Sequence, residues 1–438
     1  MTYSAAIEFL YGLRLFGTKL GLENTLKLAK LQGNPQENLR FIHVAGTNGK
    51  GSTCAMLESI YRKAGLRVGL FTSPHLVSFT ERMQVNRLCM TEEKVAELTA
   101  SLAGELGGTD AALWPFHPTF FEFVTVMALS YFVEQRCELV IWETGLGGRL
   151  DATNIVRPLA SVITNIQLDH QQWLGNSLGE IATEKAGIIK PGIPVVTGAR
   201  GEAALGVIQR IASERNSPVT LVEETEFERS ASAGHLSLLG KHQKANASVA
   251  LATVQALQNT LPVSQEAIRE GFETITWPGR LQHVKIAQTE VLLDGAHNPD
   301  GARTLRDALA QEFAAREITL VLGLFKDKAW TEMCEILVPS AKRVFLVPLE
   351  SDRSANPNAV AAFCAERWPS VQVNIMVSVA AGLDAALRES FAVIAGSLHL
   401  IGEVMQLLRI IPDARSEREL NEWDAEKNQL PSPMKHHE

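Results

Sequence analysis

The chain has 438 residues, of which 46% are hydrophobic and 21% are charged, and its formal net charge is -8. This length predicts two domains, because a single hydrophobic core rarely serves more than about 300 residues. The ordinary composition excludes a mainly disordered chain, and the negative charge argues against a protein that coats nucleic acid.

Five cysteines are scattered along the chain without a CxxC pair or a zinc-type spacing. They predict reduced, mostly buried thiols of a cytoplasmic protein. Glu8 and Arg14 interrupt the apolar N-terminal stretch, which argues against a signal peptide or membrane anchor. Charged residues also interrupt the apolar segment 391–411, so it does not predict a membrane span.

Strands and helices alternate along the first part of the chain. Short apolar runs predict a parallel sheet covered on both faces. These runs are LRFIHVAG, LRVGLFTS, CELVIWETG, ASVITNI and IPVVTG. Helical patterns between them cover residues 52–65, 119–135 and 177–187. Two of these helices open at capping-box spacing, with Thr119 and Glu122 in one and Ser177 and Glu180 in the other.

A second alternating series follows Pro278 and Gly279, which predict a hinge. It contains EVLLDG, a helix from about Pro299, ITLVLGLF, RVFLVPL, VQVNIMV and AVIAG. The whole pattern predicts an α/β protein with two sheets.

We place the predicted domain boundary near the start of the second series. Residues 1–283 are expected to form a domain with a mostly parallel sheet, and residues 284–425 a smaller Rossmann-like α/β domain. The charged, proline-containing end is expected to fray from about Pro412, with residues 426–438 as a flexible tail.

The stretch FIHVAGTNGKGST, residues 41–53, predicts a phosphate-binding loop between a strand and a helix. Glycines allow backbone N–H groups to face an anion, and a lysine can reach the terminal phosphates. The spacing departs from GxxxxGK[ST], and an ordinary strand-turn-helix corner is the alternative. The candidate nucleotide-binding residues are Gly46, Thr47, Asn48, Gly49, Lys50, Gly51 and Ser52.

Polar residues follow two other predicted strands. Glu143 ends the run LVIWE, where its carboxylate could hold magnesium, or could instead be satisfied by a neighbouring helix end. Asp169 and His170 follow ASVITNI in the same way. Histidine is an unusual magnesium ligand, so a structural role is the alternative for His170.

Lys185 lies beside alanine and isoleucine in EKAGII. A desolvated lysine loses its proton more readily, and the neutral amine can add carbon dioxide to form a carbamate. A surface lysine in contact with Glu184 is the alternative.

GTNGKGS resembles the phosphate loop of the Mur ligase superfamily and, within it, the folylpolyglutamate synthase and dihydrofolate synthase family. The resemblance continues in order through TSPHL, FTERM, ETGLGGRLDATN, TNIQLDH, EKAGIIK, HQKANA, PGR and DGAHNP. It implies a Mur-ligase-like, P-loop-containing first domain and a Rossmann-like second domain.

The resemblance also implies the ligands of the site. Two Mg²⁺ ions would be held by Ser73, Glu143, His170 and a carboxylated Lys185. Across the cleft between the domains, ATP would be contacted by Asn246, Arg280, Asp294 and His297, with Arg280 near the terminal phosphate.

The acid substrate would lie on three further segments, one of which is the N-terminal GTKLGL, residues 17–22. The other two contribute Thr119, Phe120, Phe121, Glu122, Leu150, Asp151 and Ala152. The alternatives are that Thr119 and Glu122 only cap a helix, that both phenylalanines are core residues, and that Asn298 is only an N-cap.

The family activity implied is ATP-dependent addition of L-glutamate to dihydropteroate, to the γ-carboxylate of a folate, or to both, through an acyl phosphate. Lys50, His170, Lys185 and Arg280 are the predicted catalytic residues. A peptide ligase for UDP-MurNAc-type precursors, a nucleotide-binding regulator with slow ATPase activity and a folate carrier are the alternatives. We expect a monomer with small-molecule partners and no organic cofactor beyond folate.

Two residues depart from the family pattern. Ala329 follows KDK where the family often reads DKD, and His399 stands where a tyrosine is common. Both bear on the part of the site that would receive the amino acid.

Overall fold

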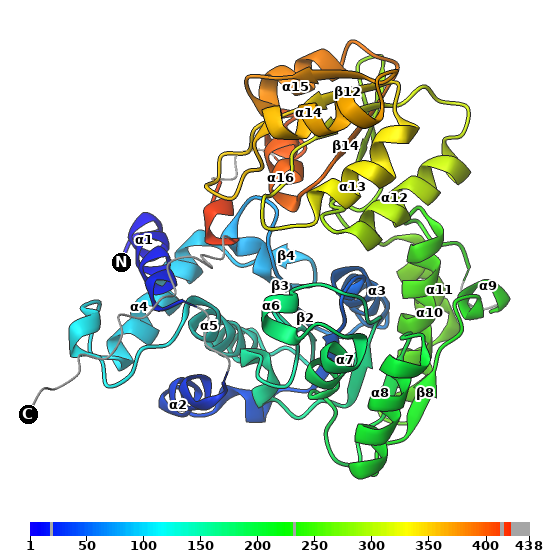
Figure 1. Cartoon of the computed structure of the whole chain (residues 1–438). Coiled ribbons are helices and arrows are strands. Elements are labelled where there is room, and N and C mark those ends of the chain that lie inside the picture. The colour runs from blue at the N-terminus through cyan, green and yellow to red at the C-terminus, as the bar shows by residue number, and fades with distance from the viewer. Residues whose placement is uncertain (18–20, 231–233, 412–415, 422–438) are drawn as a thin grey trace, which may run out of the picture.

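The computed structural model describes residues 1–17, 21–230, 234–411 and 416–421, so the predicted tail lies outside the described residues. The chain forms two α/β lobes, one around an eight-stranded sheet and the other around a six-stranded sheet (Figure 1). Every strand and helix predicted in the two series is present.

The first sheet has the order β4-β3-β2-β5-β1-β6-β7-β8 and is parallel from β2 to β8. Its strands are β1 (Phe41–Ala45), β2 (Val68–Phe71), β3 (Met83–Val85), β4 (Leu88–Cys89), β5 (Leu139–Glu143), β6 (Ala160–Ile163), β7 (Val195–Thr197) and β8 (Val219–Leu221). Our sequence analysis missed β3, β4 and β8, which have only two or three residues each; β4 and β8 are the edge strands, and β3 lies next to β4.

Helices cover both faces of this sheet. They are α1 (Tyr3–Leu13), α2 (Glu23–Leu31), α3 (Lys50–Lys63), α4 (Glu92–Glu105), α5 (Phe120–Glu134), α6 (Gln171–Leu174), α7 (Leu178–Ala186), α8 (Glu202–Glu214), α9 (Glu226–Arg229), α10 (Lys241–Ala256) and α11 (Gln265–Glu273). Neighbouring β5 residues face opposite cores, because Trp142 packs with α5 and Ile141 packs with α3. Both faces are therefore buried, as the near-continuous apolar runs predicted.

The second sheet has the order β13-β12-β11-β14-β10-β9, with only β9 antiparallel. Its strands are β9 (Gln282–Ile286), β10 (Thr289–Leu293), β11 (Thr319–Leu322), β12 (Arg343–Leu346), β13 (Gln372–Ile375) and β14 (Phe391–Ala395). Its helices are α12 (Pro299–Glu312), α13 (Trp330–Leu337), α14 (Pro357–Arg367), α15 (Val379–Ala386) and α16 (Leu398–Leu407). The second sheet thus begins next to the predicted hinge.

The two lobes share an apolar contact. Leu76 and Val77, which follow β2 in the first lobe, belong to the core cluster of the second lobe together with Ile401 and Val404 of α16. Gly402 of α16 lies directly against the carbonyl oxygen of Leu76, so close that a Cβ at this position would overlap it. This contact fixes where the second lobe sits.

The segment Glu417–Asn421, which we call the return segment, corrects for its own residues the expectation that the chain frays from about Pro412, while residues 412–415 lie outside the described residues. After α16 it lies against the first lobe (Figure 1), where the backbone N–H of Glu417 donates to the carbonyl of Val77 at 2.9 Å. Leu420 is buried. The sequence prediction was wrong here because charged composition alone does not show that individual residues can be paired or buried.

The cysteines match their prediction, since four are buried and all five, including the exposed Cys89, are free thiols. Within the described residues, no helix combines the length and the apolar character needed to cross a bilayer.

The contact at Gly402 yields a paired prediction. Gly402→Ala should lower the free energy of unfolding by about 1–3 kcal/mol, because the added methyl must displace the Leu76 carbonyl. Gly206→Ala is the control, since Gly206 is also helical but has open space around it, and alanine there should stabilise by about 0.5–1 kcal/mol. Urea denaturation measures both. Equal effects of the two substitutions would contradict the contact.

Candidate active site

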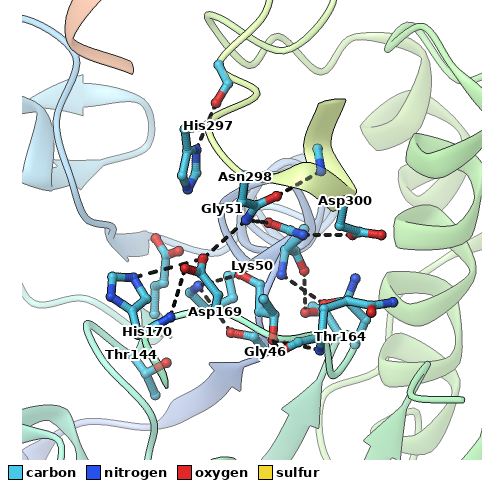
Figure 2. A pocket seen from close by; sticks show the side chains of 18 of the residues that line it. Gly46, Lys50, Gly51, Thr144, Thr164, Asp169, His170, His297, Asn298 and Asp300 are labelled. Atoms are coloured by element: carbon cyan, nitrogen blue, oxygen red, sulfur yellow. Dashed lines mark hydrogen bonds and ion pairs between the residues drawn. The ribbon is translucent and has the colours of Figure 1, made fainter. Parts of the chain in front are cut away.

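A cleft of about 960 Å³ lies where the carboxyl ends of the first sheet's parallel strands face the second lobe. All the candidate site residues named above line this one cleft. Figure 2 shows its centre, with Lys50 and His170 from the first lobe below His297 and Asn298 from the second.

The phosphate loop is held by residues that follow β6. The backbone N–H of Asn48 donates to Oδ1 of Asn165 at 2.8 Å, and Thr164 Oγ1 donates to the Asn48 carbonyl at 2.7 Å. The next helix, α3, has Gly49 as its N-cap and no capping side chain. Its first N–H groups are therefore available to an anion in the cleft.

Two loop positions require glycine. Gly49 has φ +82°, and a Cβ there would overlap the side-chain oxygen of Asn246 from α10. Gly46 has φ +148°, and a Cβ there would overlap the hydroxyl of Thr164. The loop can lie this close to its neighbours only because both residues lack a side chain. This arrangement favours the phosphate-loop interpretation over an ordinary corner.

Two lysines converge on the carbonyl oxygen of Gly46. Lys50 Nζ donates to it at 3.2 Å and to the Thr47 carbonyl at 3.1 Å, while Lys185 Nζ donates to it at 2.8 Å. Lys185 is buried, so the surface-lysine alternative is wrong. Burial, followed by the nearby charge of Lys50, lowers the pKa of Lys185 to about 7. A substantial fraction of its amine is therefore neutral at physiological pH.

Glu143 and His170 supply donors suited to a metal ion. Glu143 is buried and accepts one hydrogen bond, from the backbone N–H of Ser73 at 3.1 Å, rather than one from a helix end. Burial raises its pKa to about 7, against the opposing charge of Lys50. Partial burial and then the nearby charge of Lys328 lower the pKa of His170, whose side chain is 38% exposed, so its imidazole is neutral.

The predicted metal ligands fit magnesium only as a sparse set. In the described parts of the chain, no three His, Cys, Asp or Glu residues gather to hold an ion. The predicted set contains just two residues of these types, Glu143 and His170. Magnesium is often held by one or two carboxylates together with waters and substrate phosphates, so a buried carboxylate beside a phosphate loop is an adequate anchor.

Polar contacts join the two lobes at the centre of the cleft (Figure 2). Asp169 accepts from Lys328 Nζ at 3.0 Å and from Asn298 Nδ2 at 3.1 Å, and Asn48 donates to Asp300 at 2.8 Å. Burial alone would raise the pKa of Asp169, but Lys328 holds it well below its usual range. Asn298 caps α12 and also reaches the first lobe, so it is more than an N-cap.

The predicted nucleotide-binding residues of the second lobe also have structural roles. Asp294 accepts from the backbone N–H groups of Leu281 and Ala296 at 2.9 and 3.0 Å, which fixes the hinge. Arg280 is in contact with the cleft, and burial lowers its pKa. His297 donates from Nδ1 to the Gly295 carbonyl at 2.9 Å when neutral, which leaves Nε2 toward the cleft.

The predicted acid-binding segments are shaped by local capping. Thr119 and Glu122 form the full capping box of α5, and Asp151 accepts from the backbone N–H of Leu146 at 2.7 Å. Their capping roles are therefore real, although all of these residues line the cleft. Phe120 and Phe121 line it too and pack against the core at its edge.

Several cleft residues were missed by the sequence analysis. They are Arg82, Asn165, Asp300, Arg353 and the return-segment residues Arg418 and Asn421. The motif FTERM contains Arg82 but assigns it no role, and nothing in the sequence indicates that the return segment reaches the cleft.

The comparisons with known proteins agree with this geometry. Residues 44–254 match the Mur ligase middle domain, and residues 279–398 match the Mur ligase, glutamate ligase domain. The dihydrofolate synthase/folylpolyglutamate synthase of Bacillus subtilis is 37% identical over 81% of this chain and 86% of its own length.

The chain belongs to the folylpolyglutamate synthase/dihydrofolate synthase family of Mur ligases. Two solved members are similar throughout. The structure of Mycobacterium tuberculosis folylpolyglutamate synthase complexed with ADP and AMPPCP has a TM-score of 0.83 and 29% identity, covering 93% of this chain and 99% of its own. Escherichia coli FolC in complex with DHPP and ADP has a TM-score of 0.81 and 31% identity, covering 94% and 98%.

The phosphate loop yields a second paired prediction. Gly49→Ala should weaken binding of AMPPCP by more than about tenfold, because the methyl displaces Asn246 and the φ of +82° is strained. Gly65→Ala is the control, since Gly65 has φ +91° but open space around it. It carries the same kind of strain, of about 1 kcal/mol, and should leave nucleotide binding unchanged. Calorimetric titration measures both variants, and equal losses would count against the loop's role.

Proposed function

We propose that this protein is an ATP-dependent ligase that adds L-glutamate to dihydropteroate and to the γ-carboxylate of folates. The observation that supports this most is the convergence, in one interlobe cleft, of the phosphate loop, the buried Glu143 and Arg280. The names of the similar proteins, several of which include both activities, support the same choice.

The chemistry explains why ATP is needed. A carboxylate does not react with an amine at neutral pH, because an oxide is too poor a leaving group. Transfer of the γ-phosphoryl group of ATP to a carboxylate oxygen gives ADP and an acyl phosphate. The neutral α-amine of glutamate then attacks the carbonyl carbon, and phosphate leaves as the amide forms and the amine loses a proton.

The chain's own residues would stabilise the charge that gathers during phosphoryl transfer. Lys50 would turn from the Gly46 and Thr47 carbonyls to the terminal phosphates, and Arg280 would approach from the hinge. Glu143, Ser73 and His170 would hold one magnesium ion, and a carbamate on Lys185 would help to hold a second. When bound, magnesium supplies further neutralisation of the phosphate oxygens.

The contacts between the lobes suit an acyl phosphate, which water would hydrolyse. Asn48 and Asp169 reach Asn298, Asp300 and Lys328 across the cleft, so closure brings the second lobe over the reacting groups. A slow regulatory ATPase would not need a buried lysine at this place, and a folate carrier would not need a phosphate loop.

Product analysis tests the proposed function. With ATP and glutamate, dihydropteroate and tetrahydrofolate should each gain one glutamyl unit by mass spectrometry, with one ADP formed per amide. ADP release that does not depend on the acid would favour the regulator, and no ADP release with retained pterin binding would favour a carrier. If only one of the two acids gains a glutamyl unit, the enzyme has that activity and lacks the other.

The Lys185 carbamate gives a prediction on pH and carbon dioxide. At a fixed pressure of carbon dioxide, kcat should rise from pH 6 to pH 8, because the neutral fraction of the Lys185 amine rises through its pKa of about 7. Removal of carbon dioxide should lower kcat, and ¹³C-labelled carbon dioxide should give a carbamate resonance.

Lys185→Arg is the matched variant, since it keeps the positive charge but cannot form the carbamate. Its kcat should fall by more than about 100-fold and should no longer respond to carbon dioxide. If the kcat of the parent enzyme does not depend on carbon dioxide at any pH, the carbamate is refuted but the ligase activity is not.

A further inference from the structure

We propose that Arg82 binds the carboxylate of the acid substrate and that the return segment positions Arg82 for this task. The inference rests on the proposed function and assigns a residue for which neither the sequence motif nor the nucleotide site gives a role.

Arg82 is a buried cation that forms no ion pair with a carboxylate within the described part of the chain. Its side chain is in contact with the cleft, yet the residue as a whole is only 3% exposed. Its Nε donates to His75 Nδ1 at 2.9 Å and its Nη2 donates to Asn421 Oδ1 at 2.6 Å. Both partners are neutral, and among the described residues no acidic side chain forms an ion pair with it. Nearby carboxylates compensate the buried charge only from a distance, because none in the described ranges forms an ion pair with Arg82, and an anionic ligand in direct contact would compensate it further.

The surroundings of Arg82 select the kind of anion. Its guanidinium lies over the ring of Phe120 with its central carbon 5.3 Å from the ring centroid. Burial lowers the pKa of Arg82, and the nearby charges of Glu81 and, to a smaller extent, of Glu143, the candidate metal ligand, oppose that effect. Arg82 therefore stands between the aromatic wall of the acid pocket and the phosphoryl-transfer site. The reacting carboxylate of an aryl or glutamyl acid has to lie at this junction.

The return segment fixes the guanidinium from the far end of the chain. His75 must carry its proton on Nε2, because Nδ1 accepts from Arg82, and this Nε2–H donates to the Glu417 carbonyl at 2.9 Å. Asn421 Nδ2 donates to the His75 carbonyl at 2.8 Å while its Oδ1 accepts from Arg82. The Glu417 carboxylate accepts from the Phe79 N–H at 2.8 Å. Removal of Asn421 should thus loosen Arg82 without removing its charge.

The test compares binding of dihydropteroate with binding of its uncharged carboxamide to the full-length, AMPPCP-bound protein. The parent should prefer the acid by about 10- to 100-fold, the typical effect of a charge-assisted hydrogen bond. Arg82→Gln should abolish this preference but leave carboxamide and AMPPCP affinities unchanged. Arg82→Lys should keep part of the preference, and Asn421→Ala should reduce it.

Arg210→Gln is the control, because Arg210 is exposed on α8 and, among the residues that the structure describes, forms an ion pair only with Glu214. Its preference for dihydropteroate over the carboxamide should equal that of the parent. The proposal is overturned if the parent binds the acid and the carboxamide equally, or if Arg82→Gln keeps the full preference for the acid. It is also overturned if Arg82→Gln no longer binds the acid, the carboxamide and AMPPCP. A parent that prefers the acid through Arg82 but forms no amide would refute the proposed ligase activity and leave this assignment in place.

Discussion

The side-chain nitrogens of Lys50 and Lys185 both donate to a single carbonyl oxygen at the start of the phosphate loop. One peptide dipole cannot neutralise the charge of Lys50 together with the charged fraction of the buried Lys185, so this point in the molecule favours negative charge from elsewhere. Glu143 supplies part of it, and burial keeps that carboxylate from being fully ionised on its own. A triphosphate is the ligand that this local imbalance is suited to accept.

Contacts elsewhere in the molecule hold the phosphate loop in place and fix the second lobe over it. Thr164 and Asn165 hold the loop from the neighbouring strand, while Asn246 of α10 lies against Gly49. The second lobe is located by the apolar contact of Leu76 with α16 and by the polar contacts around Asp169. Apolar packing therefore sets the position of the lobe, and polar side chains in the cleft refine it.

Much of this arrangement could be predicted from the sequence, because the features that carry it are local. Strong apolar runs predicted the parallel strands, and the glycines around Lys50 predicted the phosphate loop. Residues at strand ends, such as Glu143 and His170, converge because parallel strands end at one edge of a sheet. The capping boxes at Thr119 and Ser177 are likewise set within four residues.

What could not be predicted depends on contacts between distant segments. Arg82 meets Asn421 across 339 positions, and the pairing of Asp169 with Lys328 spans 159. The exposure of Lys185 was undecided in the sequence for the same reason, since the Gly46 carbonyl that it reaches is 139 residues away. The short strands β3, β4 and β8 lacked a periodic signal long enough to detect.

The course of the chain after α16 limits how the lobes can move. The polypeptide passes from the first lobe to the second near Gly279 and comes back to the first at Glu417, so two covalent crossings join the halves. Because the chain is anchored to the first lobe on both sides of the second lobe, neither end of the second lobe is free, and this limits how far the two lobes can separate.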